Sequence, residues 1–282
     1  MRSTVERHEL TSAGLRISYL EEGHGGSEVV LLLHDGGFGG SADTSFRGLI
    51  PLLVEQGYRV LAPDLVGFGS SQKAVFLDEA PFAVQIRTLS DFVSQLDAEQ
   101  AHVVGNSFGG TVALRNLCAG NPLHANTVTS IGGTGGPWRV PEGMRPLLEY
   151  DGSEAAMAAL VDVLAVEPPD PEYVVRRNEV ARQPGHYQAL VAPRANAPRA
   201  PEGPPRVDSF LEDLAGSTVP ILLIAGKNDP TNEPEWWTHI EAVTSDVRTV
   251  VLDSRHSPNI DTPATVAAAF VEWQRSLAAR NS

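Results

Sequence analysis

The 282-residue sequence has one cysteine, Cys118, and no long apolar run. A single cysteine excludes an intrachain disulfide and a cysteine metal cluster. The longest apolar runs, such as Val29–Leu33, are far too short to span a membrane. The first residues also lack the apolar stretch of a secretory signal, so we expect a cytoplasmic protein.

Basic residues are also scarce. Lys and Arg number 21 against 35 Asp and Glu, which gives a formal net charge of −14. This balance argues against nucleic acid or an anionic membrane surface as a partner. It says little about a small-molecule substrate, because a pocket can have a local field of the opposite sign. The sequence leaves the oligomeric state open, with a homo-oligomer (dimer or tetramer) as one alternative.

Short β-rich runs alternate with amphipathic segments, which predicts a mostly parallel sheet covered by helices. The expected strands are 29–33, 59–62, 102–104, 127–131, 221–224 and 249–252, with an antiparallel edge beginning at 16–20. Apolar residues at helical spacing predict helices over Phe82–Leu96 and Val266–Leu277. The second helix is expected to have Thr262 as its cap and Pro263 as its first residue.

The alternation stops between about Pro137 and Asp213, in a Pro-rich and mixed helical stretch that ends in Ala197–Pro205. Sheet-like sequence resumes at Val219. We interpret residues 137–213 as a helical cap inserted over the carboxyl edge of the sheet, with residues 1–136 and 214–282 as the core domain. Two independent domains fit less well, because neither half would have a full sheet.

A candidate nucleophile lies in 105–109, which reads G-N-S-F-G between an expected strand and a helical stretch. The pattern G-x-S-x-G in that setting is typical of a nucleophile elbow. The turn is so tight that Gly105 and Gly109 must lack side chains, and Ser107 is pushed out above the sheet. The helix behind points its N-terminus at the site, which favours developing negative charge. An ordinary Gly-rich turn is the alternative.

A glycine-rich loop, 34–40 (H-D-G-G-F-G-G), follows the strand at 29–33. Backbone N–H groups from such a loop can form an oxyanion hole. We expect one N–H from Phe108 and the other from Gly36 or Gly37. A phosphate-binding loop fits neither of the usual glycine patterns. Asp35 would oppose an oxyanion, so its side chain is expected to turn away, and the loop histidine is expected to be structural.

The acid and the base are expected in the order Ser, Asp or Glu, then His. Asp229 and His256 each follow one of the last two expected strands, at the same sheet edge as the elbow. His256 can take the proton of Ser107, while Asp229 fixes the histidine tautomer. Asp253 is a weaker rival acid, because it precedes His256 by only three residues, and the loop after Ile131 offers no acid.

By these motifs, and by the block Ala62–Ser70, the chain resembles the α/β-hydrolase superfamily over almost its whole length. The resemblance implies a mostly parallel central sheet flanked by helices, a helical cap, and no metal or organic cofactor. Within the superfamily the chain looks most like the meta-cleavage product hydrolases, which cut a carbon–carbon bond in products of aromatic ring opening. Asn106 precedes the nucleophile as in that group, and Arg176 falls where their cap helix carries an arginine for the substrate carboxylate. Arg177 is the neighbour that could substitute.

Three positions depart from that group. Phe38 replaces the proline of their oxyanion loop, Ser45 their loop asparagine, and Ser257 the tryptophan after their histidine. By the resemblance, these three positions and the two that match the group are all expected to contact the substrate: Arg176, Asn106, Ser45, Phe38 and Ser257.

The resemblance implies hydrolysis of a 2-hydroxy-6-oxo-dienoate or similar vinylogous diketone acid. A carboxylesterase or lactonase acting on a natural product needs the same triad and stays an alternative, as does a cofactor-free haloperoxidase or perhydrolase. A non-catalytic binding protein of this fold would usually lack a triad residue, and none is missing. Dehalogenases and epoxide hydrolases of this fold generally use an aspartate nucleophile, which Ser107 replaces.

Overall fold

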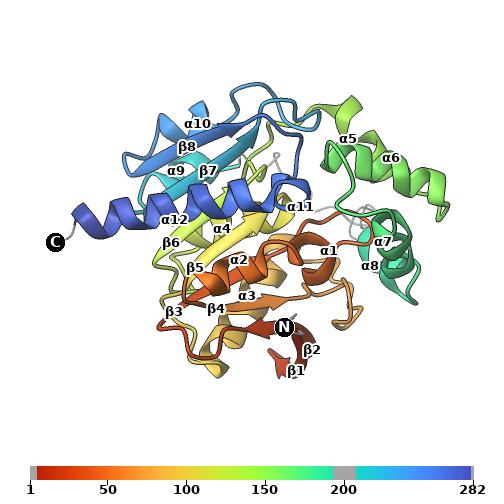
Figure 1. The fold of residues 1–282 in the computed structure, drawn as a ribbon, viewed down its shortest axis with the longest axis horizontal. Helices are drawn as coiled ribbons and strands as arrows, with labels where there is room; N and C mark the ends of the chain where they lie inside the picture. Colours follow the sequence, from red (N-terminus) through yellow and green to blue (C-terminus); the bar gives the residue numbers. More distant parts are fainter. Residues whose placement is uncertain (1–4, 193–207, 281–282) are drawn as a thin grey trace.

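The computed structural model describes residues 5–192 and 208–280, and its centre is one eight-stranded sheet (Figure 1). The strand order is β1-β2-β4-β3-β5-β6-β7-β8. The strands are β1 (Glu6–Ser12), β2 (Leu15–Glu22), β3 (Glu28–Leu33), β4 (Tyr58–Pro63), β5 (His102–Asn106), β6 (Thr127–Ile131), β7 (Ile221–Gly226) and β8 (Val247–Leu252). The pairs β1–β2 and β2–β4 are antiparallel, and all others are parallel. The expected strands are confirmed, and β1 is an addition that the sequence did not predict.

Helices lie on both faces of the sheet and beyond one of its ends (Figure 1). They are α1 (Ala42–Phe46), α2 (Ile50–Glu55), α3 (Pro81–Gln95), α4 (Phe108–Cys118), α5 (Pro141–Leu148), α6 (Glu154–Leu164), α7 (Tyr173–Ala181), α8 (His186–Val191), α9 (Phe210–Leu214), α10 (Thr238–Glu241), α11 (Pro258–Asp261) and α12 (Pro263–Arg280). The start of α12 at Pro263 confirms the prediction from its cap. No helix in the described part of the chain is long and apolar enough to cross a membrane.

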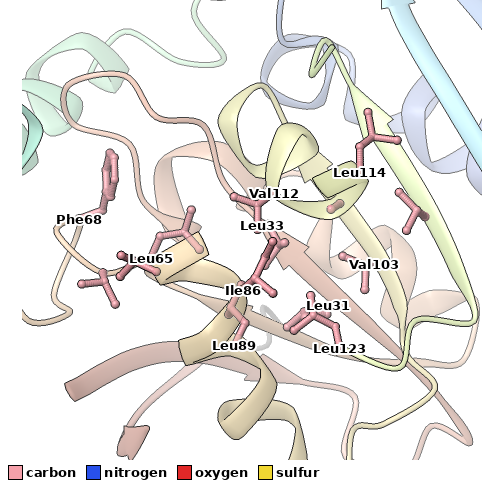
Figure 2. Packing of buried hydrophobic residues seen from close by; sticks show 14 of the residues in the cluster. Leu31, Leu33, Leu65, Phe68, Ile86, Leu89, Val103, Val112, Leu114 and Leu123 are labelled. Carbon is pink, nitrogen blue, oxygen red and sulfur yellow. The ribbon is translucent and has the colours of Figure 1, made fainter. Parts of the chain in front are cut away.

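The two faces of the sheet carry separate cores because side chains alternate along each strand. In β3, Val30 and Leu32 belong to the cluster that includes α2 and α12. Leu31 and Leu33 belong to the other cluster, with α3 and α4. Figure 2 shows this second cluster, where Leu31 and Leu33 meet side chains of both helices. Burial on both faces explains why the central strands are continuous apolar runs.

Four helices, α5 to α8, lie between β6 and β7 in the sequence and gather beyond one end of the sheet (Figure 1). They contact loops that follow the carboxyl ends of strands. The Ser257 N–H, after β8, donates to Leu164 O of α6 at 2.7 Å. Arg177 of α7 binds Asp35, after β3. These contacts put the helices over the carboxyl edge.

We propose the division into a cap, 137–213, and a core, 1–136 with 214–282, on the basis of these contacts. Helix α9 crosses the second boundary and packs against α4 of the core. The Pro-rich segment 197–205, which we assigned to the cap, lies outside the described residues.

Helix α4 packs very closely under β3. A Cβ added to Gly109 would lie 2.0 Å from Leu33 O, and one added to Gly105 would lie 2.2 Å from Gly109 C. Because both obstacles are backbone atoms, no side chain can rotate to make room. The glycines of the elbow are therefore required by packing.

Gly109→Ala should displace α4 and lower the free energy of unfolding by about 3 kcal/mol. Gly25→Ala is the matched control, because its added Cβ would meet no atom within 4 Å, and it should change stability by no more than about 0.5 kcal/mol. Urea unfolding of the two variants checks this. Equal stabilities would contradict the packing argument.

Candidate active site

Ser107 sits at the junction of β5 and α4 in a strained backbone conformation. Its φ is 54° and its ψ is −111°, a region that residues with a side chain rarely adopt. Its N–H donates to Ile131 O of β6 at 2.7 Å, which holds the turn against the neighbouring strand. The result is a serine presented above the carboxyl edge, as a nucleophile elbow requires.

Ser107, His256 and Asp229 form a continuous chain of hydrogen bonds. His256 Nε2 lies 2.7 Å from Ser107 Oγ, and His256 Nδ1 lies 2.7 Å from Asp229 Oδ2. Because the carboxylate can only accept, Nδ1 carries the proton and Nε2 is free to accept that of the serine. Asp253, the rival acid, instead accepts from Asn228 Nδ2 at 2.9 Å on the surface. The geometry can thus move a proton from the serine to the histidine.

The carboxylate of Asp229 is held by donors that the sequence analysis missed. Thr231 donates to Oδ1 from both its N–H and its hydroxyl, each at 2.8 Å, and Asn232 Nδ2 donates to Oδ2 at 2.8 Å. Burial would raise the pKa of Asp229, but the charge of His256 and the hydrogen bonds from His256 and Thr231 lower it. The acid therefore stays ionised. Polar residues directly after Asp229-Pro230 were the available signal, since aspartate in a turn often binds the backbone two residues on.

The two candidates for the second oxyanion donor, Gly36 and Gly37, differ in the contacts that the structure gives them. Gly37 N–H donates to Asp35 Oδ1 at 2.9 Å and is already used. Gly36 lines the same cavity as Ser107 and Phe108, and a Cβ on it would lie 2.7 Å from that of Phe108. As the first residue of α4, Phe108 has an N–H without an intrahelical acceptor. We therefore propose Gly36 and Phe108 as the pair of oxyanion donors.

Ser107 opens into a cavity of about 440 Å³ with mainly apolar walls. Its apolar lining comes from α3, α4, α5, α6, α8 and the loop between β4 and α3: Val66, Phe68, Ala74, Phe76, Pro81, Val84, Phe108, Met144, Leu147, Leu148, Leu164, Ala189 and Leu190. Such a cavity suits a small organic molecule with an apolar body.

A buried ion pair closes one side of this cavity. Arg177 Nη2 donates to Asp35 Oδ1 at 2.6 Å and Nη1 to Oδ2 at 3.2 Å, while both side chains are almost fully buried. Asp35 also accepts from Ser45 Oγ at 2.9 Å. Burial would raise the pKa of Asp35, but the charge and hydrogen bonds of Arg177 lower it from 3.8 to about 2. The expected conflict between Asp35 and an oxyanion is thus resolved by a neutralising cation.

The prediction that Arg176 faces the cleft is corrected by the structure. Its guanidinium binds Asp170 through two hydrogen bonds, at 2.8 and 2.7 Å, and does not line the cavity. Side chains of successive helical residues point about 100° apart around the helix axis. Arg177, the next residue, therefore points inward where Arg176 does not. In the sequence, Asp170 lies six residues before Arg176, and this nearby carboxylate could have predicted that Arg176 forms an ion pair away from the cavity.

The other predicted substrate contacts are also corrected, because none of them lines the cavity. Asn106 donates to Ile131 O at 3.2 Å and accepts from Ser257 Oγ at 3.1 Å. Ser45 binds Asp35, and Phe38 is buried against aromatic rings of the cap. All four support the loops beneath the site.

Within residues 5–192 and 208–280, no three His, Cys, Asp or Glu side chains gather as metal ligands. His34, the loop histidine, accepts from Leu65 N–H at 2.9 Å through Nε2 and donates from Nδ1 to Asp35 O at 2.7 Å. Its two nitrogens hold the loops after β3 and β4 together, which is a structural role.

Residues 30–269 match the Alpha/beta hydrolase family, and the chain belongs to that family. It is 34% identical over 161 residues to 2-hydroxy-6-oxo-6-(2'-aminophenyl)hexa-2,4-dienoic acid hydrolase of Metapseudomonas resinovorans, covering 57% of this chain and 53% of that one. It is 29% identical over 188 residues to 2-hydroxymuconate semialdehyde hydrolase of Pseudomonas sp. (strain CF600), covering 65% and 64%. The chain thus spans about half to two thirds of the length of these relatives.

The solved structure of a meta-cleavage product hydrolase from Pseudomonas fluorescens IP01, a mutant complexed with acetates, is similar in fold. The TM-score is 0.79 at 25% identity, with 95% of this chain and 98% of that chain covered. The likeness extends over both the sheet and the helices between β6 and β7.

Ser107→Ala and His256→Ala should each reduce kcat on any accepted substrate by about 10⁴-fold or more, on the order of losses known for serine triads. Asp229→Asn should cost about 10⁴-fold, because an amide favours the wrong histidine tautomer. Asp253→Asn is the control and should keep near-normal activity. A severe loss in Asp253→Asn with an active Asp229→Asn would show that the acid is misassigned.

Asp35→Asn should lower the free energy of unfolding by about 3–5 kcal/mol, because it leaves Arg177 as an uncompensated buried charge. The depressed pKa of Asp35 means that the pair stabilises the fold above pH 3.8 and that this stabilisation is lost as the pH falls towards about 2. The difference in the free energy of unfolding between wild type and Asp35→Asn should therefore become smaller as the pH falls from 3.8 to about 2.

Asp170→Asn is the control for this test, since its pair with Arg176 is only partly buried and a pair near the surface is worth about 0–1 kcal/mol. The double variant Asp35→Leu with Arg177→Met should lower the free energy of unfolding by less than the sum of the losses in the two single variants. Urea unfolding at pH 7 and pH 3 measures both effects, and an unchanged stability of Asp35→Asn would contradict the role given to the pair.

Proposed function

We propose that this protein is a hydrolase that uses Ser107, His256 and Asp229 as a catalytic triad. The observation that carries the proposal is the hydrogen-bonded chain from Asp229 to Ser107 Oγ, at 2.7 Å in both contacts, opening into an apolar cavity. His256 takes the serine proton as Oγ attacks a carbonyl carbon. The N–H groups of Gly36 and Phe108 stabilise the oxyanion that forms.

The proposed substrate class is a vinylogous diketone acid of the 2-hydroxy-6-oxo-dienoate type. The names of both curated relatives support it, as does a cavity that accommodates an apolar substituent. The enol must first become a ketone so that the diene can accept electrons. Attack at the distant carbonyl then breaks the carbon–carbon bond, one fragment leaves with the electron pair and takes a proton, and water releases the acyl fragment as an acid.

A carboxylesterase or lactonase is the second candidate, and one observation favours it. The inward arginine of the cap helix, Arg177, is already bound by Asp35. It therefore has no free charge for a substrate carboxylate on that side of the cavity. An ester or lactone needs none, and its hydrolysis uses the same triad and oxyanion hole.

A substrate panel distinguishes the two candidates. Wild type and Ser107→Ala are compared on a 2-hydroxy-6-oxo-dienoate acid and on a neutral aryl ester of similar size. We expect wild type to cleave the acid with the higher kcat/KM and Ser107→Ala to cleave neither at an appreciable rate. Turnover of the ester alone would support the esterase. No turnover of either substrate, together with no labelling of Ser107 by a fluorophosphonate, would refute the hydrolase.

A further inference from the structure

The wall of the cavity carries one cationic side chain among the described residues, and it is Arg139. Arg139 follows β6 on the loop that leads into α5. The loop is fixed by a single antiparallel bridge between Arg139 and Asn232, which lies in the loop after β7. Arg139, at the start of the proposed cap, is thus tied to the loop after β7 of the core.

Arg139 lacks the carboxylate partner that the other arginines near the site have. Its Nη1 donates to Asn232 Oδ1, with a longer contact of 3.5 Å to Gly132 O. In the described parts of the chain no carboxylate lies within 4.0 Å of it, whereas Arg176 and Arg177 each bind an aspartate. Arg139 is half-buried. Partly withdrawing a guanidinium from water without an anion is costly, and burial lowers the pKa of Arg139 although Asp229 raises it.

The strand order sets Arg139 apart from Asp35. Ser107 follows β5, which has β3 on one side and β6 on the other. Asp35 follows β3 and Arg139 lies beyond β6, so the two flank the nucleophile on opposite sides. The β3 side has a neutral Asp35–Arg177 pair, and the β6 side has a cation with unused donors. An anionic group entering the cavity is therefore attracted to the β6 side.

We propose that Arg139 binds the anionic group of the substrate, a carboxylate or another anionic oxygen, and so determines substrate class and orientation. This inference rests on the proposed function, since it concerns the molecule that Ser107 attacks. The guanidinium presents a planar set of donors that can bind two carboxylate oxygens at once. The substrate acid then lies on the β6 side of the nucleophile, and its apolar body extends along the cavity.

The contacts of Asn232 suggest a second role for Arg139, in which it binds no substrate. It accepts from Arg139 and donates to Asp229 Oδ2 at 2.8 Å, so Arg139 could act only through Asn232, by orienting the acid of the triad. That role would change the reactivity of Ser107 and leave the affinity for an anion unchanged. The test therefore measures the two quantities separately.

The experiment measures how benzoate slows fluorophosphonate labelling of Ser107, followed by intact mass. The labelling rate without benzoate reports the reactivity of the serine, and the benzoate concentration that halves it reports anion affinity. Benzamide, which is neutral, is the matched ligand. Wild type is compared with Arg139→Gln and with Arg176→Gln, a change to the arginine that lies outside the cavity.

We expect benzoate to protect wild type and Arg176→Gln equally. Loss of a charge-assisted pair in Arg139→Gln should raise the half-protecting benzoate concentration by about tenfold to a hundredfold, with little change for benzamide. Arg139→Lys should fall between the two, because an ammonium keeps the charge but not the planar fork. If Arg139→Gln does not fold, Arg139→Lys is the variant whose benzoate affinity is compared with that of wild type.

Three results would overturn the inference: no protection of wild type by benzoate, equal protection of wild type and the Arg139 variants, or slower labelling of those variants at unchanged benzoate affinity. The last would assign Arg139 to positioning through Asn232. Absence of labelling in wild type would instead refute the proposed function. Benzoate binding measured by calorimetry would then still test Arg139.

Discussion

The buried pair of Asp35 and Arg177 joins the helices after β6 to the loop after β3, and the geometry of the site depends on it. The aspartate binds the arginine of α7, the hydroxyl of Ser45 and the N–H of Gly37. These contacts fix the loop that carries Gly36, which lines the same cavity as Ser107. Without Asp35 the buried charge of Arg177 would be unpaired, and without Arg177 the cavity would be lined by an unpaired carboxylate.

Charge is therefore distributed unevenly around Ser107. On one side the charges are paired, so a neutral carbonyl and its oxyanion can approach without repulsion. On the other side Arg139 has Asn232 between it and Asp229, and its remaining donors are available to a ligand. The net charge of −14 gives no indication of this arrangement, because the field in a small cavity is set by the few groups that line it.

Most of the fold could be predicted from the sequence because its signals are local. Apolar runs predicted the parallel strands, and Thr262-Pro263 predicted the start of α12. The edge strand β1 was missed because Glu6–Ser12 is largely polar and exposed, so it lacks the apolar pattern.

The triad residues were brought together as predicted from chain order, whereas the substrate contacts were not. The choice between Arg176 and Arg177 depends on helix rotation and on Asp170. The buried roles of Asn106, Phe38 and Ser257 depend on partners far away in the sequence, and that of Ser45 depends on how the loop after β3 folds back onto it. Arg139 was missed because its exposure to the cavity is a property of the assembled loops and follows no motif.

The hydrogen bond from Ser257 N–H to Leu164 O links the cap to the core one residue after His256. Ser257 is fully buried, so this amide meets solvent only when α6 separates from the loop after β8. Its rate of deuterium uptake consequently measures how often the cap opens beside the base. The same backbone contact thus ties the position of α6 to that of the loop that carries His256, and a ligand that holds the two together would slow the exchange of that single proton.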